Sequence, residues 1–111
     1  MQTRQDQEQQ EQHNNNQYYY SNFINSLKTQ NTKINYKRRL SYFMTFLGIK
    51  EGEYSKLVDG LDKKRIEDNI KSFLVYLRQQ KGGVSYQSGS HYLNAIKKFY
   101  YVNTEFDFRW Q

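Results

Sequence analysis

Four polar side chains share one face of a predicted helix in the C-terminal third of the sequence. They are separated by four, three and four residues, a spacing that aligns them along one side of an α-helix. Amide, imidazole and ammonium groups on an outward helix face can contact phosphates and base edges in a DNA groove. A solvated helix surface carries the same residue types, so these residues alone leave both interpretations open. The four are Gln87, His91, Asn94 and Lys98, with Ser90 and Lys97 beside them.

The helix that carries these residues is predicted to span 85–101, with Ser85 as its N-cap and its end near residues 102–103. Its other side has apolar or small residues at i, i+4, i+7 and i+11, a spacing typical of a buried stripe. We therefore expect this side to pack on the rest of the domain. The stripe consists of Gly89, Leu93, Ile96 and Tyr100.

A helix predicted at 30–48 begins with Asn31 or Thr32 as N-cap and ends at Gly48, a residue that readily adopts the left-handed conformation. It has a buried stripe at helical period and a flank of cations. Because residues 21–50 contain no acid, these cations have no partner of their own and are available to an outside one. The stripe is Tyr36, Leu40, Phe43, Met44 and Leu47, and the cations are Lys33, Lys37, Arg38 and Arg39.

A helix predicted at 61–81 has Asp62 as its N-cap, and two glycines at 82–83 end it. Its stripe repeats the spacing of the preceding helix, so the two helices are expected to pack together. Shorter helical segments are predicted at 21–28 and 54–58. The sequence therefore predicts an all-α domain, a bundle of four to five helices. The stripe is Ile66, Ile70, Phe73, Leu74 and Leu77.

Composition divides the chain into three parts. Residues 1–20 contain seven glutamines and no aliphatic residue after Met1. Such a segment cannot bury enough apolar surface to offset its ordering entropy, so we expect a disordered tail, at least through Gln17. Residues 21–103 form the helical domain. Residues 104–111 alternate aromatic with polar residues, as an extended linker would.

The charge is distributed unevenly along the chain. The total is +6, and residues 21–111 hold 16 Lys and Arg against eight acids. Six of these acids fall between Glu51 and Asp68, whereas residues 69–104 contain five cations and no acid. A basic surface broken by one acidic segment favours a polyanion on one side of the molecule. A generic basic domain would have the same total charge.

Residue sets for catalysis or metal binding are missing from the sequence. It has no Cys, and its only histidines are His13 and His91, so neither a thiolate or histidine metal site nor a nucleophilic triad can form. No Gly-rich phosphate loop is present. We therefore expect no catalysis by this chain alone, no metal and no cofactor. With no apolar segment long enough for a membrane span, no signal peptide and no Cys, a cytoplasmic location is expected.

The order of the helices, and residues within them, match a known pattern. The residues that carry the likeness are Asn31, Thr32, Tyr36, Leu40, Phe43 and Phe46, then Ser85, Ser88 and the run LNAIKKFY at 93–100. Over about residues 23–110 the chain resembles the N-terminal core-binding domain of tyrosine recombinases, the phage-integrase-type site-specific recombinases, with archaeal integrases the most similar. The resemblance implies a SAM-like fold that clamps one face of duplex DNA during integration and recombination. A separate catalytic domain would grip the other face.

By this resemblance, the helices at 30–48 and 85–101 approach the DNA, with cations on phosphates and polar side chains near base edges or sugars. The family's catalytic arginines, lysine, His-x-x-Arg box and nucleophilic tyrosine belong to the second domain. Asn94 stands where that box would have Arg after His91, so no tyrosine here is expected to be a nucleophile. The implied DNA-binding residues are Thr32, Lys33, Lys37, Arg38, Ser85, Gln87, Ser88, His91, Asn94, Lys97 and Lys98.

Double-stranded DNA is thus the expected partner, together with a catalytic domain or other recombinase protomers. Two alternatives stay open. A helical protein-interaction module would bind its partner through the aromatic residues Phe106, Phe108 and Trp110. A small architectural DNA-binding protein would bind DNA without any recombinase. Three adjacent tyrosines at 18–20 are expected to pack on the first helix, although tyrosines can also stack on bases.

Overall fold

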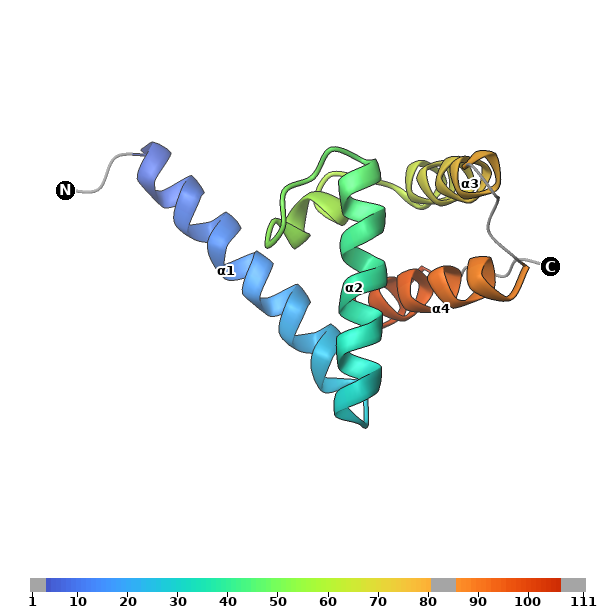
Figure 1. The fold of residues 1–111 in the computed structure, drawn as a ribbon. Coiled ribbons are helices and arrows are strands. Elements are labelled where there is room, and N and C mark those ends of the chain that lie inside the picture. Colours follow the sequence, from blue (N-terminus) through green and yellow to red (C-terminus); the bar gives the residue numbers. More distant parts are fainter. Residues whose placement is uncertain (1–3, 81–85, 107–111) are drawn as a thin grey trace.

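The structure, a computed structural model, describes residues 4–80 and 86–106, with side chains for 15–80 and 88–106. Within these residues the elements are α1 (Arg4–Asn25), α2 (Gln30–Phe46), the short 3-10 helix η1 (Tyr54–Leu57), α3 (Lys63–Gln79) and α4 (Tyr86–Asn103) (Figure 1). The described residues form helices and connecting turns, without a strand. The prediction of an all-α helical bundle is confirmed.

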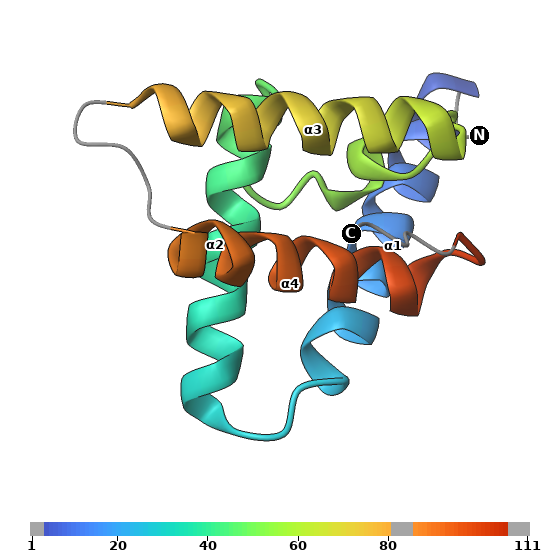
Figure 2. The same ribbon diagram turned by 90° about the vertical axis from the view of Figure 1, so that its right-hand side faces the viewer.

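The helices α1, α2 and α3 all contact α4. α1 and α2 meet at a tight connection and diverge like the arms of a V, and α2 crosses α4 steeply (Figure 1 and Figure 2). Figure 2 shows α3 and α4 lying alongside each other with opposite chain directions. Since α4 contacts α1, α2 and α3, its position depends on all three.

Aromatic side chains from all four α-helices meet in the core. Phe73 of α3 places its ring 5.2 Å from that of Phe43 on α2 and 5.8 Å from that of Tyr92 on α4, in edge-to-face contacts. Phe99 of α4 contacts Phe23 of α1 in the same way at 5.6 Å. Such pairs add to the stabilisation from burial alone. Most of the stripe residues predicted on α2 and α3 are buried: Leu40, Phe43, Met44, Ile66, Ile70, Phe73 and Leu77.

The start of α2 differs from the prediction in its capping residue. Thr29, not Asn31 or Thr32, is the N-cap, and its Oγ1 accepts a hydrogen bond of 3.1 Å from the backbone N–H of Thr32. A side-chain oxygen at this position satisfies a backbone donor that the helix itself leaves unpaired. Gly48 follows the helix with φ of 77°, so the predicted left-handed ending is confirmed.

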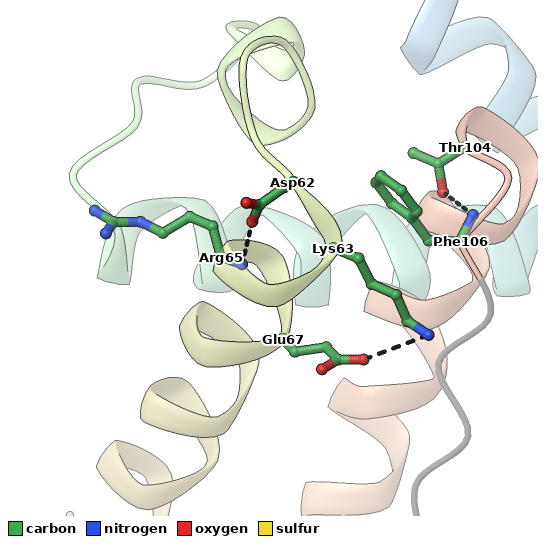
Figure 3. A network of polar contacts seen from close by, with 6 residues as sticks. All are labelled: Asp62, Lys63, Arg65, Glu67, Thr104 and Phe106. Atoms are coloured by element: carbon green, nitrogen blue, oxygen red, sulfur yellow. Dashed lines mark hydrogen bonds and ion pairs between the residues drawn. The ribbon is translucent and has the colours of Figure 1, made fainter.

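Asp62 caps α3 as predicted. Its Oδ1 accepts a hydrogen bond of 2.8 Å from the backbone N–H of Arg65, and Lys63 pairs with Glu67 at 3.8 Å one turn along (Figure 3). The Asp62 carboxylate satisfies a backbone donor that lacks a helical partner in the first turn. The Lys63–Glu67 ion pair stabilises the same end of the helix through its side chains. The glycines predicted to end this helix, at 82–83, lie outside the described residues.

The N-terminal segment corrects the predicted domain boundary. Composition predicts disorder through residue 20, whereas α1 is one continuous helix that also absorbs the short helix predicted after the tail. Asn16 Oδ1 accepts a hydrogen bond of 2.7 Å from the backbone N–H of Ser55, and the Tyr19 hydroxyl donates one of 2.6 Å to Asp59. These side chains attach α1 to η1 and the turn after it. The folded domain therefore begins before residue 21.

The buried face of α4 is rotated relative to the predicted stripe. Ile96 and Tyr100 are buried as predicted, but Ala95 and Phe99 are also fully buried, whereas Leu93 is only partly buried. The rotation follows from packing, because α4 is covered by α1, α2 and α3 together. Fewer residues of α4 therefore face outward than the predicted stripe would leave.

The chain after α4 turns back onto the domain. The Thr104 hydroxyl donates a hydrogen bond of 2.7 Å to the Tyr100 carbonyl. Its oxygen accepts one of 3.2 Å from the backbone N–H of Phe106 (Figure 3). Phe106 packs against the hydrophobic core. Phe108 and Trp110, the other two residues of the predicted aromatic linker, lie outside the described residues.

Candidate nucleic-acid interface

The two helices expected to approach DNA form one open cleft between them. α2 contributes residues at i, i+3, i+4 and i+7, which lie along one side of the helix, and α4 contributes two at i and i+3. The cleft has a volume of about 310 Å³, and no carboxylate lines it. Its lining residues, called the cleft residues below, are Thr32, Asn35, Tyr36, Arg39, His91 and Asn94.

Arg39 of α2 and His91 of α4 meet across this cleft. The Arg39 Nη2 atom lies 3.4 Å from His91 Nδ1, a long hydrogen bond. A guanidinium group can only donate, so Nδ1 is the acceptor in this hydrogen bond, which requires the tautomer with the proton on Nε2. The Nε2–H group is then a donor, and Arg39 has further N–H groups in the same cleft. The pair combines a permanent positive charge with several hydrogen-bond donors.

The predicted contacts on α4 that the structure describes lie on its outward side. His91 and Asn94 are exposed and line the cleft. Lys98 follows Asn94 by one helical turn, and its ammonium group lies 5.8 Å from the ring centroid of Tyr101. The Tyr101 side chain is 73% exposed, so its ring is accessible to a ligand, while Lys98 is half-buried. Lys97 is half-buried.

The first turn of α4 is described only in part. Ser88 is exposed, on the same helix as the cleft residues. Of Gln87 the side chain lies outside the described residues, and Ser85 lies outside them entirely. The predicted roles of these last two residues therefore stay predictions.

The predicted contacts on α2 do not share one face. Thr32 lies in the cleft, but the Lys37 ammonium group sits over the Tyr20 ring of α1, 5.5 Å from its centroid. Tyr20 in turn stacks on Tyr54 at 5.1 Å, so it packs within the domain as predicted. Lys33 lies one turn before Lys37 on the α1 side. The α2 cations thus do not act as one group: Arg39 lies in the cleft, Lys37 lies over Tyr20, and exposed Arg38 belongs to neither place.

Sequence reasoning missed one cleft residue, Asn35, and placed Arg39 among the cations open to a partner without naming it a DNA contact. It assigned Tyr36 to the core alone. Asn35 and Arg39 follow Thr32 by three and seven residues, a spacing that indicates a common helix face. Tyr36 has two contacts: its ring stacks on Phe23 at 6.4 Å and also lines the cleft. The spacing was therefore a usable signal, but the neighbouring helix was needed to show which face mattered.

Several acids of the central segment have partners outside the cleft. Asp59 accepts from Tyr19, and Asp62 accepts from the first turn of α3. The Lys56 ammonium group lies 2.8 Å from Glu53, and its hydrogen bond holds the pKa of that carboxyl below its usual value. The charge of Arg39 in the cleft is therefore not balanced by a carboxylate among the cleft residues.

No group of three or more His, Asp or Glu side chains among the described residues could hold a metal ion. Burial raises the pKa of Tyr100, whose hydroxyl donates to the Leu57 carbonyl, so this tyrosine stays protonated. None of the helices in the described part of the chain has the length and apolar character needed to cross a membrane.

Compared with protein-family models, with curated proteins and with solved structures, the chain matches none of them. The residues of α2 and α4 are therefore the basis on which a function is proposed. Their relevant features are the donors gathered in the cleft and the cations beside it.

Proposed function

We propose that this domain binds double-stranded DNA through the α2–α4 face, as the non-catalytic core-binding domain of a tyrosine-type site-specific recombinase. We define the α2–α4 face as the cleft residues together with Lys98 and with exposed Arg38, which precedes Arg39 on α2 but lies outside the cleft. In the family that the sequence resembles, the corresponding helices clamp DNA during integration and recombination. A catalytic domain or other recombinase protomers would be its protein partners. This function implies a cytoplasmic location, on the nucleoid when DNA is bound.

One observation carries the proposal: α2 and α4 bring Thr32, Arg39, His91 and Asn94 into a single cleft without a carboxylate. Hydroxyl, guanidinium, imidazole and amide groups contact phosphates, sugars and base edges in protein–DNA complexes. Phosphate contacts supply most of the affinity and position the protein on the duplex. Because one domain makes few such contacts, the affinity is expected to be weak and mostly independent of sequence.

Fluorescence anisotropy on a labelled duplex of about 30 base pairs, titrated at several salt concentrations, tests DNA binding. Log affinity should fall against log salt with a slope of about −0.9Z, where Z is the number of neutralised phosphates, and we expect Z of roughly 3–5. Absence of binding even at low salt would contradict DNA binding by this domain.

A pair of double variants tests the face. Replacing Arg38 and Lys98 together with alanine should lower affinity and reduce Z by about two. Replacing Lys64 and Lys71 of α3, which are exposed, removes the same charge and serves as the control. The control should weaken binding much less. Equal loss in both variants would mean that overall positive charge, not the α2–α4 face, governs binding.

The recombinase context has a separate test in the source genome. A split or truncated recombinase would have, in the adjacent downstream sequence, codons for the Arg…His-x-x-Arg…Tyr series of a catalytic domain. DNA binding without such a series would favour the small architectural DNA-binding protein. DNA binding by the α2–α4 face is common to both assignments.

A further inference from the structure

The cleft between α2 and α4 has the features of a site for one anionic group. It is bounded on both sides by helices, and its cation and its imidazole come from different helices, Arg39 and His91. Two positively charged or donor groups held together without a carboxylate are stabilised when an anion accepts from both.

We propose that this cleft is a phosphate-binding subsite in which Arg39 and His91 hold one phosphate group together. The Arg39–His91 contact sets the orientation of both groups. With Nδ1 accepting from Arg39, the imidazole must present Nε2–H as its donor. Arg39 uses Nη2 for this contact and keeps N–H groups in a planar fork, the geometry that suits two phosphate oxygens.

The remaining cleft residues supply neutral partners for the group that the phosphate is attached to. Asn35 lines the cleft from α2 and Asn94 from α4, and Thr32 lines it near the start of α2. Amides both donate and accept, so they suit a sugar or a base edge, not the phosphate alone. The volume of about 310 Å³ is at the lower limit of small-molecule sites and exceeds what one phosphate group needs. A phosphate with an attached sugar is the matching chemical class.

Two sources offer that chemistry. One is a backbone phosphodiester of duplex DNA, in which case the inference rests on the proposed function and identifies the contact that fixes the domain's register on the duplex. The other is a free phosphate ester in solution. The two sources differ in whether a duplex competes for the subsite.

A first experiment uses the full chain carrying His13→Gln, so that His91 is the only imidazole. Its ring nitrogens are followed by NMR. Before addition of ligand, the spectrum should show the proton on Nε2. Inorganic phosphate should shift the Nε2 signal in a saturable way, whereas sodium chloride at the same ionic strength should not. The added substitution Arg39→Ala should abolish the phosphate-dependent shift.

A second experiment measures duplex affinity by anisotropy for Arg39→Ala, His91→Gln and Arg38→Ala. Arg39→Ala and Arg38→Ala remove the same charge from adjacent positions, but only Arg39 lies in the cleft. Loss of a charge-assisted hydrogen bond to phosphate should make Arg39→Ala weaker than Arg38→Ala by about tenfold or more. His91→Gln keeps a donor and should lose less. Circular dichroism checks that each variant is folded.

The outcomes separate the two ideas. Selective loss of duplex affinity in Arg39→Ala supports the subsite with DNA as its source. A saturable phosphate shift at His91 without duplex binding by the unsubstituted chain supports the subsite with a free phosphate ester, and contradicts the proposed function. Duplex binding that Arg39→Ala and Arg38→Ala weaken equally, together with no phosphate shift, overturns the subsite and leaves DNA binding standing.

Discussion

The Tyr100 hydroxyl on α4 donates a hydrogen bond of 2.9 Å to the backbone carbonyl of Leu57 in η1, and both residues are fully buried. The bond joins the last helix to the only short helix of the described chain. It also satisfies a carbonyl that water cannot reach. Burial raises the pKa of Tyr100, so the donor proton is kept throughout the neutral and moderately alkaline range.

Tyr100→Phe should therefore destabilise the domain by about 1–3 kcal/mol, because the Leu57 carbonyl loses a donor in a buried setting. Urea denaturation followed by circular dichroism measures the free energy of unfolding. Tyr101→Phe is the matched control because Tyr101 is 73% exposed. Loss of its hydroxyl should change the free energy of unfolding by no more than about 0.5 kcal/mol. Equal stability of the two variants would contradict the assigned bond.

Phe73 of α3 contacts rings from both α2 and α4, including those of Phe43 and Tyr92. Phe73→Ala should cost about 3–5 kcal/mol of unfolding free energy through the lost burial and the cavity left behind. Val75 lies on the same helix and is 50% exposed, so Val75→Ala is expected to have a small effect. A small effect of Phe73→Ala in thermal or urea unfolding would place the core elsewhere.

Thr29 is the N-cap of the helix that carries most cleft residues. Thr29→Ala should lower the free energy of unfolding by about 1 kcal/mol, whereas Thr29→Ser should retain most of it because Ser also caps well. Thr32→Ala tests the alternative that the sequence favoured. If Thr32→Ala retains its stability while Thr29→Ala loses it, the capping role belongs to Thr29.

Alkaline pH should destabilise the fold through tyrosines whose pKa is raised in the folded state, Tyr54 and Tyr19 as well as Tyr100. Burial raises the pKa of Tyr54 to about 12, and burial together with the hydrogen bond to Asp59 raises that of Tyr19 to about 12, from 10.0 in both cases. The folded state then keeps protons that the unfolded chain releases. This stabilising contribution is fully present below pH 10 and is lost as the pH rises towards 12.

Urea unfolding at intervals between pH 9 and pH 11.5, within the window set by those pKa values, measures this loss. Tyr54→Phe and Tyr19→Phe should each make the decline shallower, by at most one proton. Val75→Ala, which changes no titrating group, should keep the decline of the unsubstituted chain. A decline that neither Phe variant alters would assign the alkaline sensitivity to other groups.

Local patterns predicted the parts of the fold that local physics determines. The stripe with Leu40 and Phe43, the Asp62 cap and the left-handed Gly48 all follow from helical period or backbone preference. The helical start of α1 did not follow from them. Its polar composition predicts disorder, but Asn16 is held by a backbone group 39 residues away, a contact that composition cannot reveal.

The candidate site was also predictable only where local spacing determines it. Spacing placed His91 and Asn94 on the outward side of α4, and both line the cleft. Spacing could not show that Arg39, instead of Lys37, would face them. That choice is made by the crossing of α2 and α4, and by Tyr20 of α1, over which the Lys37 ammonium group lies.

The amide of Asn22 donates to Asn103 at 3.0 Å, and Asn103 in turn donates to the Tyr19 carbonyl at 3.0 Å. These contacts join residues 81 and 84 positions apart. During synthesis on the ribosome, α1 emerges long before the end of α4. Asn22 and Tyr19 of α1 therefore lack their partner Asn103 until nearly the whole domain has been translated. The packing of α1 on α4 is therefore completed late. In a nascent chain stalled before residue 103, α1 would lack both hydrogen bonds to Asn103.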